Sequence, residues 1–216
     1  MKYKCLVFDH DDTVVNSTAT IHHPCFELYL AANYPGRSCT LEEYFLKNFD
    51  PGFVPMCRDE YGMGPEDIED ESRFWAEYVK GHIPRAYAGV REIMERHRQQ
   101  GGLICVVSHS LEENILRDYM ANSLPEPDAV YGWGRPINER KPEPFPLLDI
   151  MDRFSLNPEE LLMIDDLKPG YDMARSCGVD FAAVGWANDI PAIESFMRQN
   201  SSSYFKKVSE LAEFLA

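Results

Sequence analysis

Short strand-like runs recur along this chain, and three of them end abruptly at polar residues. Six of them have the length of strands; they cover residues 5–8, 103–107, 129–131, 161–164, 181–186 and 204–208. Runs of this length with a sharp polar end are typical of parallel strands that are buried on both faces.

Stretches with helical spacing of apolar residues lie between these runs. The predicted helices cover residues 90–97, 112–120, 145–154, 171–177 and 210–216, with Ser209 as the N-cap of the last. Strands and helices therefore alternate. This order predicts an α/β fold with a Rossmann-like, doubly wound parallel sheet.

Residues 18–84 interrupt the alternation with an all-helical pattern. Thr40 and Glu43 form the pattern of a capping box, which opens a helix that runs to Phe49. Residues 21–32 and the stretch after Pro65 also show helical spacing. We therefore expect a Rossmann-like core made of residues 1–17 and 85–216, and a helical domain made of residues 18–84.

Composition and charge exclude several classes of partner. The formal net charge is −15, which argues against nucleic acid, because affinity for a polyanion depends on Lys and Arg that neutralise phosphates. No apolar run approaches the about 20 residues that a membrane span needs, and the first residues leave no room for a signal peptide. The six cysteines form no C-x-x-C pair, so we expect mostly buried, reduced thiols in a cytoplasmic protein.

Polar side chains stand where three of the apolar runs end. Asp9 and Asp11 follow the first run, Ser108 follows the second, and Asp165 and Asp166 follow the run at 161–164. The carboxyl ends of parallel strands lie along one edge of a sheet, so we expect these groups to meet there. Crowded carboxylates repel one another and need a cation or a shared proton.

This combination of groups suits phosphoryl transfer through a covalent aspartyl-phosphate. One carboxylate attacks phosphorus, and a second protonates the leaving oxygen and later activates water. Mg²⁺ on carboxylate oxygens neutralises charge at the phosphoryl group, while a hydroxyl and an ammonium group hold its other oxygens.

The same motifs, in the same order, resemble those of the haloacid dehalogenase superfamily of phosphohydrolases. The D-x-D-x-T motif reads Asp9-His10-Asp11-Asp12-Thr13, the strand-end Ser or Thr is Ser108, the Lys before a helix is Lys141, and the acidic pair is Asp165-Asp166. The helical insert resembles the C1-type cap of that family.

The resemblance implies a role for each matching residue. Asp9 is expected to be the nucleophile and Asp11 the general acid/base. The other expected roles are phosphate binding by Ser108, His109 and Lys141, Mg²⁺ binding by Asp9, Asp11, Asp166 and Asp165, and substrate contact by His10 and His22. Asp12 stands where the family usually has Gly, and we expect its side chain to point to solvent or to the backbone, away from the phosphate.

The function implied by the resemblance is Mg²⁺-dependent hydrolysis of a small phosphomonoester, such as a sugar phosphate or a phosphoglycolate-like metabolite, by a monomer or homodimer. Two alternatives stay open. A phosphomutase of the β-phosphoglucomutase type uses the same first motif. A receiver-like or catalytically inactive phosphate-binding signalling module belongs to a different class.

Overall fold

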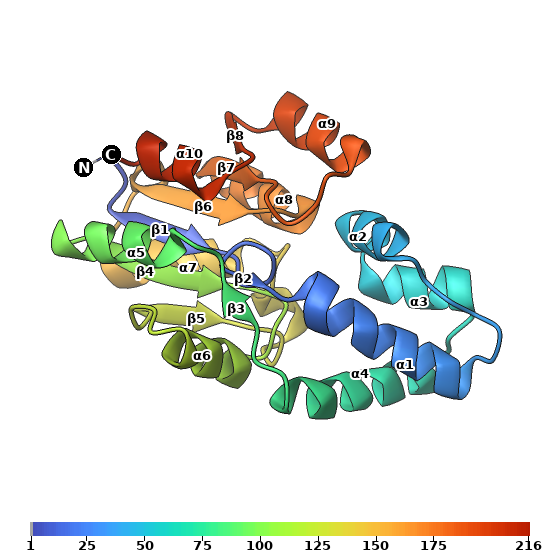
Figure 1. Cartoon of the computed structure of the whole chain (residues 1–216). Coiled ribbons are helices and arrows are strands. Elements are labelled where there is room, and N and C mark those ends of the chain that lie inside the picture. Colours follow the sequence, from blue (N-terminus) through green and yellow to red (C-terminus); the bar gives the residue numbers. More distant parts are fainter. Residues whose placement is uncertain (1) are drawn as a thin grey trace. The chain divides into compact units, whose positions relative to one another are not determined.

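The computed structural model describes residues 2–216; Met1, which falls in the first expected core segment, lies outside them. These residues form two compact units, shown in Figure 1. The core unit comprises the residues up to Asn16 together with Arg85–Ala216, and the helical unit comprises Ser17–Pro84.

Six strands of the described residues form one parallel sheet in the core unit, in the order β5-β4-β1-β6-β7-β8 (Figure 1). β1 is central, and its last residue, Phe8, pairs with Val106 of β4 and Ile164 of β6. The predicted α/β fold with a doubly wound parallel sheet is confirmed. The strands are β1 (Cys5–Phe8), β4 (Leu103–Val107), β5 (Ala129–Tyr131), β6 (Leu161–Asp165), β7 (Asp180–Val184) and β8 (Ser203–Phe205).

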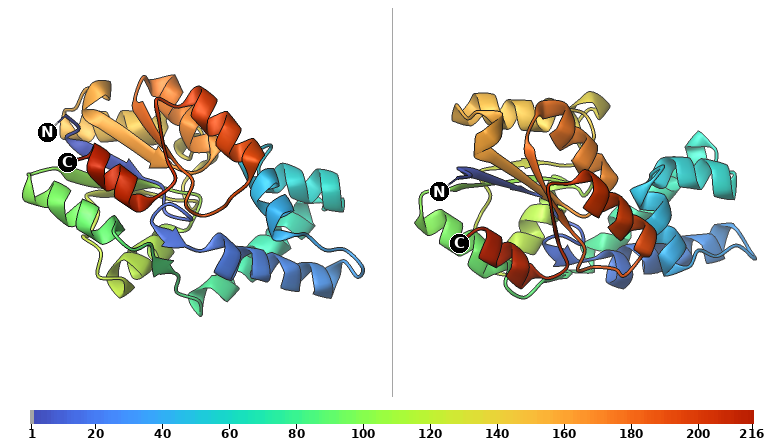
Figure 2. Two further views of the ribbon diagram at one scale, coloured as in Figure 1. Left: turned by 45° about the horizontal axis from the view of Figure 1, so that its top comes forward. Right: turned by 90° about the horizontal axis from the view of Figure 1, so that it is seen from above.

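Helices cover both faces of this sheet, as Figure 2 shows. On one face, α5 (Val90–Gln99), α6 (Glu112–Ala121) and α10 (Val208–Phe214) share an apolar cluster with alternate strand residues such as Phe8 and Val106. α7 (Phe145–Phe154) packs on α8 (Lys168–Cys177), which contacts β6 and β7. α9 (Pro191–Asn200) connects β7 to β8. Because consecutive residues of a strand point to opposite faces, these strands had to be apolar throughout.

Some local predictions were wrong or incomplete. Ser209 does not cap the last helix: α10 begins at Val208, and the Glu210 carboxylate accepts hydrogen bonds from the backbone N–H groups of Lys206 and Lys207 at 2.7 and 3.1 Å. α8 begins at Lys168, three residues before the expected start. Sequence pattern also failed to predict two helices, α3 (Phe53–Tyr61) and α9, and several short elements: β2 (Val15–Asn16), β3 (Arg85–Ala86), η2 (Ile137–Glu139) and η3 (Pro158–Glu160).

The helical unit contains η1 (Thr18–His22), α1 (His23–Asn33), α2 (Leu41–Phe49), α3 (Phe53–Tyr61) and α4 (Pro65–Lys80). The predicted capping box is confirmed, because the Thr40 hydroxyl accepts from the Glu43 N–H at 3.2 Å and the Glu43 carboxylate accepts from the Thr40 N–H at 2.8 Å. The unit has its own core of aromatic and sulfur-containing side chains, including Phe26, Tyr29 and Met56.

Two predictions from composition can be compared with the structure. All six cysteines are free, and only Cys177 is more than slightly exposed, which confirms the expected buried thiols. Among the described residues, we find no helix with the length and hydropathy needed to cross a membrane.

Glu71 is a buried acid in the core of the helical unit. Its side chain lies on α4 and is 3 % exposed. Burial raises the pKa of this carboxyl group from 4.5 to about 7, although His22 acts in the opposite direction. Below pH 4.5 the proton is bound in both the folded and the unfolded state. Between pH 4.5 and 7 only the unfolded state loses it, so this group lowers stability as the pH rises through that window.

We therefore expect Glu71→Gln to stabilise the protein at alkaline pH and to have little effect in acid. The gain over wild type should be about 3 kcal/mol at pH 8 and close to zero at pH 4. Urea unfolding of both proteins at the two pH values measures it. Glu69→Gln, on an exposed part of the same helix, serves as the control. A stability difference that does not change with pH would contradict the prediction.

Candidate active site

The centre of the site is the loop that follows β1. Asp9 comes directly after the strand, and its N–H still donates to the Ile164 carbonyl of β6 at 2.9 Å, so the sheet fixes its backbone. Asp12 then takes a left-handed conformation with φ of 59°, and its N–H donates to the Val15 carbonyl at 2.7 Å. Asp is among the few residues other than glycine that adopt this conformation readily. The tight turn keeps Asp9 and Asp11 at the carboxyl edge of the sheet.

Lys141 joins two of the strand ends. Its ammonium group donates to Asp9 Oδ1 and to Asp165 Oδ2, each at 2.8 Å, and the three side chains are almost fully buried. Burial by itself lowers the pKa of Lys141, but the Asp165 and Asp9 carboxylates outweigh it and the pKa is raised. The lysine therefore stays charged, and it lies in hydrogen-bonding contact with the predicted nucleophile.

Three buried carboxylates lie close enough together to hold one cation. Asp9, Asp165 and Asp166 each present an oxygen within 4.8 Å of the other two. Burial, followed by the charges of neighbouring acids, raises the pKa of Asp166 well above its usual value. Burial also raises the pKa of Asp9 to about 7, with Lys141 opposing and the other acids reinforcing the shift. One lysine does not neutralise this cluster, and hard oxygen donors under such repulsion fit a divalent ion such as Mg²⁺.

Within this cluster, Asp165 accepts a hydrogen bond at 2.8 Å on each of its two carboxylate oxygens. One of its oxygens accepts from Lys141, and the other accepts from the Leu167 N–H at 2.8 Å. Gly170 of α8 packs directly against it, and a Cβ at that position would lie 1.9 Å from Asp165 Oδ2. These contacts make Asp165 a support for Lys141. They leave Asp9 and Asp166 as the acids better placed to reach a cation.

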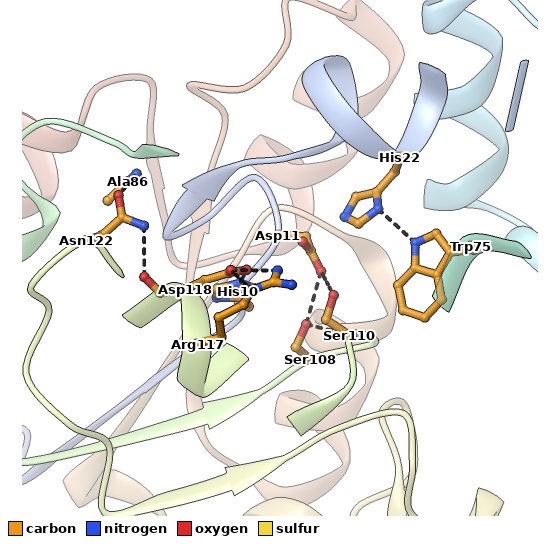
Figure 3. A network of polar contacts seen from close by, with 10 residues as sticks. All are labelled: His10, Asp11, His22, Trp75, Ala86, Ser108, Ser110, Arg117, Asp118 and Asn122. Atoms are coloured by element: carbon orange, nitrogen blue, oxygen red, sulfur yellow. Dashed lines mark hydrogen bonds and ion pairs between the residues drawn. The ribbon is translucent and has the colours of Figure 1, made fainter. Parts of the chain in front are cut away.

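Asp11 is held by two serines of the loop after β4 (Figure 3). The Ser110 hydroxyl donates to Asp11 Oδ2 at 2.6 Å, and the Ser108 hydroxyl donates to the same oxygen at 3.4 Å. Ser110 was not among the predicted site residues. Its position two residues after Ser108, in a serine-histidine-serine run, was the available signal.

The His10 side chain points into the interior. It is 1 % exposed, its Nε2 lies 3.1 Å from Asp118 Oδ2, and Arg117 also binds Asp118. In Figure 3, His10 faces Asp118 while Asp11 faces Ser108 and Ser110. This burial gives no support to the predicted substrate contact by His10 and instead suggests that the histidine anchors the loop after β1 to α6.

Of the two directions expected for the Asp12 side chain, solvent and backbone, solvent is excluded, because the residue is only 3 % exposed. Its negative charge adds to the burial that raises the pKa of Asp166. Thr13, the last residue of the first motif, donates from its hydroxyl to Asp166 Oδ1 at 3.3 Å. The motif threonine therefore orients one of the predicted metal ligands.

His109 forms a hydrogen bond with the backbone of Lys141. Its Nε2 donates to the Lys141 carbonyl at 2.8 Å. Burial, and then the positive charge of Lys141, lowers the pKa of His109 to about 4, so the ring is neutral at pH 7. The ring therefore holds the backbone of Lys141 in place.

The remaining predicted site residue, His22, lies in the helical unit. Its Nδ1 accepts a hydrogen bond from the Trp75 indole N–H at 3.0 Å, as Figure 3 shows. Because Nδ1 accepts this hydrogen bond, the ring proton of His22 is on Nε2.

Comparisons with known proteins give a family, two similar curated proteins and a solved structure with the same fold. The family model described as haloacid dehalogenase-like hydrolase matches residues 6–184. A pyrophosphatase PpaX from Halalkalibacterium halodurans is 25% identical over 194 residues, covering 87% of this chain and 86% of the relative. A phosphoglycolate phosphatase from Thiobacillus denitrificans is 25% identical over 185 residues, covering 81% and 80%. A solved haloacid dehalogenase-like family hydrolase from Streptococcus pneumoniae has a TM-score of 0.77 at 16% identity, covering 100% and 99%.

Proposed function

The chain belongs to the haloacid dehalogenase-like hydrolase family, and on that basis we propose that it hydrolyses a small phosphomonoester through a phosphoryl group held transiently on Asp9. The sequence-based family assignment is thus confirmed, while the substrate, the metal and the residue roles are proposals. The observation that carries the proposal is the contact of Lys141 with Asp9 and Asp165 at the strand ends, with the Asp11 loop beside it.

In the proposed reaction, a carboxylate oxygen of Asp9 attacks phosphorus and the alcohol leaves. Asp11 donates the proton that the leaving oxygen needs, and it later removes a proton from the water that cleaves the aspartyl-phosphate. The Lys141 ammonium group and the Ser108 hydroxyl hold phosphoryl oxygens and stabilise the charge that develops on them.

Asp9 and Asp166, with the Asp11 backbone carbonyl, would hold the Mg²⁺ ion. The ion would favour the ionised form of Asp9 and neutralise phosphoryl charge when bound. Thr13 and Asp165 would keep Asp166 and Lys141 in position. The helical unit would serve as the cap that excludes water from the site.

The relatives named above support a substrate in which the phosphate is attached to a small group. Phosphoglycolate and pyrophosphate are the compounds in their names. We propose a phosphorylated metabolite of that size as the substrate of this chain.

A phosphometabolite screen with and without Mg²⁺ tests the proposal. We expect phosphate release from at least one small phosphomonoester with Mg²⁺, and a fall of at least about 100-fold in EDTA that excess Mg²⁺ reverses. Full activity in EDTA would refute the metal assignment. Isomerisation of a sugar 1-phosphate without phosphate release would indicate a mutase, and a stable phosphoenzyme without turnover would indicate a signalling module.

A further inference from the structure

Arg140 immediately precedes Lys141, and none of the described residues forms an ion pair with it. Its guanidinium carbon lies 4.2 Å from the centre of the Trp133 ring. Its Nε is buried and has no hydrogen-bond partner among the described residues. The chain has 36 acidic residues against 21 Lys and Arg, so acidic partners are abundant. A buried donor without an acceptor costs about 1–3 kcal/mol, unless a ligand supplies the acceptor.

Backbone and ring contacts place this cluster next to the proposed phosphoryl site. The backbone N–H of Trp133 donates to the Ser110 carbonyl at 2.9 Å. The Trp133 ring meets the His109 ring edge-on, with the ring centres 5.6 Å apart. His109 in turn follows Ser108 and binds the Lys141 carbonyl. Trp133, His109 and Arg140 are therefore each connected to a residue of the proposed site.

The electrostatic environment agrees with this placement. Burial is the largest cause of the low pKa of His109, and both Lys141 and Arg140 add to the shift. Both cations are thus near one neutral ring. Two positive charges at this edge of an acidic chain favour a ligand with more than one anionic group.

The Arg140 guanidinium group lies over the face of the Trp133 ring. A guanidinium group stacked on an indole keeps its planar set of N–H donors free along the edge. Such a group binds carboxylate or phosphate through two parallel hydrogen bonds, and a fixed group loses less conformational entropy on binding.

We infer that Arg140, held on Trp133, binds a second anionic group of the substrate, so that the enzyme selects small phosphate compounds with a carboxylate or another phosphate near the transferred phosphoryl group. This inference rests on the proposed function. It makes Arg140 a specificity residue, distinct from the residues that carry the reaction.

Arg140→Gln tests the inference with three probes in Mg²⁺. Phosphoglycolate carries a carboxylate, pyrophosphate carries a second phosphate, and phenyl phosphate carries neither. We expect kcat/KM to fall about 10- to 100-fold for at least one of the first two, mainly through KM, and to change less than about threefold for phenyl phosphate. The probe that loses more identifies the anionic group. Arg140→Lys should recover only part of the loss, because an ammonium group lacks the planar fork.

Arg135→Gln is the matched control. Arg135 lies in the same loop, but its guanidinium is already bound to Glu112 at 2.7 Å. We expect this substitution to leave the ratios of kcat/KM among the three probes unchanged. Unchanged ratios in Arg140→Gln as well, or an equal loss with all three probes, would overturn the inference.

Binding measured by calorimetry separates the test of the Arg140 anion subsite from the test of the proposed phosphatase function. If wild type hydrolyses neither a probe nor any compound of the phosphometabolite screen, the proposed function fails, and the binding of pyrophosphate and of inorganic phosphate in Mg²⁺ still tests Arg140. Pyrophosphate binding at least about tenfold tighter than phosphate binding in wild type, with the difference lost in Arg140→Gln, would support the anion subsite. Equal affinities of wild type and the variant would refute it.

Discussion

Asp9→Asn is expected to lower Mg²⁺-dependent hydrolysis of p-nitrophenyl phosphate by at least about 10,000-fold while the fold survives. The amide oxygen of asparagine is a poor nucleophile and carries no charge. Asn has nearly the shape of Asp, and Lys141 keeps its second partner, Asp165, at 2.8 Å, so the buried ammonium group is not left unpaired.

The measurement is nitrophenolate release under saturating substrate, with the melting temperature as the test of folding. Asp180→Asn is the control, because Asp180 begins β7 at the opposite edge of the sheet and pairs with Lys2. The control should keep full activity. Activity of Asp9→Asn within tenfold of wild type would show that Asp9 is not the nucleophile.

Asp11→Asn is expected to lower kcat by about 100- to 10,000-fold, the range that general acid–base catalysis contributes. Its effect should differ in kind from that of Asp9→Asn. Nitrophenolate is a good leaving group that needs little help from an acid, so Asp9 should still be phosphorylated in this variant. Hydrolysis of the aspartyl-phosphate needs the base and should become slow.

Stopped-flow kinetics can separate the two variants. Asp11→Asn should release about one equivalent of nitrophenolate per enzyme in a burst, followed by slow turnover, and Asp9→Asn should show no burst. Acid-quenched Asp11→Asn should carry phosphate on Asp9. Turnover of this variant at the wild-type rate, or an equal burst in both variants, would contradict the roles proposed here.

Sequence pattern predicted which segments come together in the core. Asp9 and Asp165 follow different apolar runs, yet their carboxylate oxygens lie within 4.8 Å of each other in the fold. The prediction succeeded because parallel strands end at one edge of a sheet, so each apolar run identified where its polar successor would lie. The missed elements, such as the two-residue β2 and β3, are too short for periodicity to indicate.

Side-chain direction was less predictable. His10 lies between Asp9 and Asp11 in sequence, but its buried side chain faces Asp118 of α6. Ser110, in contrast, reaches Asp11 at 2.6 Å from another strand end. Which way a loop residue turns depends on the rotamers and neighbours that packing allows, and one sequence does not contain that information.

By itself, the sequence determined the class of fold and the strand ends that carry Asp9 and Asp11, Ser108, and Asp165 and Asp166, because hydrophobic period and strand ends are local properties. Lys141 was expected beside them only from the resemblance to a family motif. Only the tertiary structure decided that Lys141 bridges Asp9 and Asp165, that Asp12 is buried in a left-handed conformation, and that Arg140 stacks on Trp133. These contacts join residues from different strand ends, and their charges and burial arise only when the sheet brings those ends together.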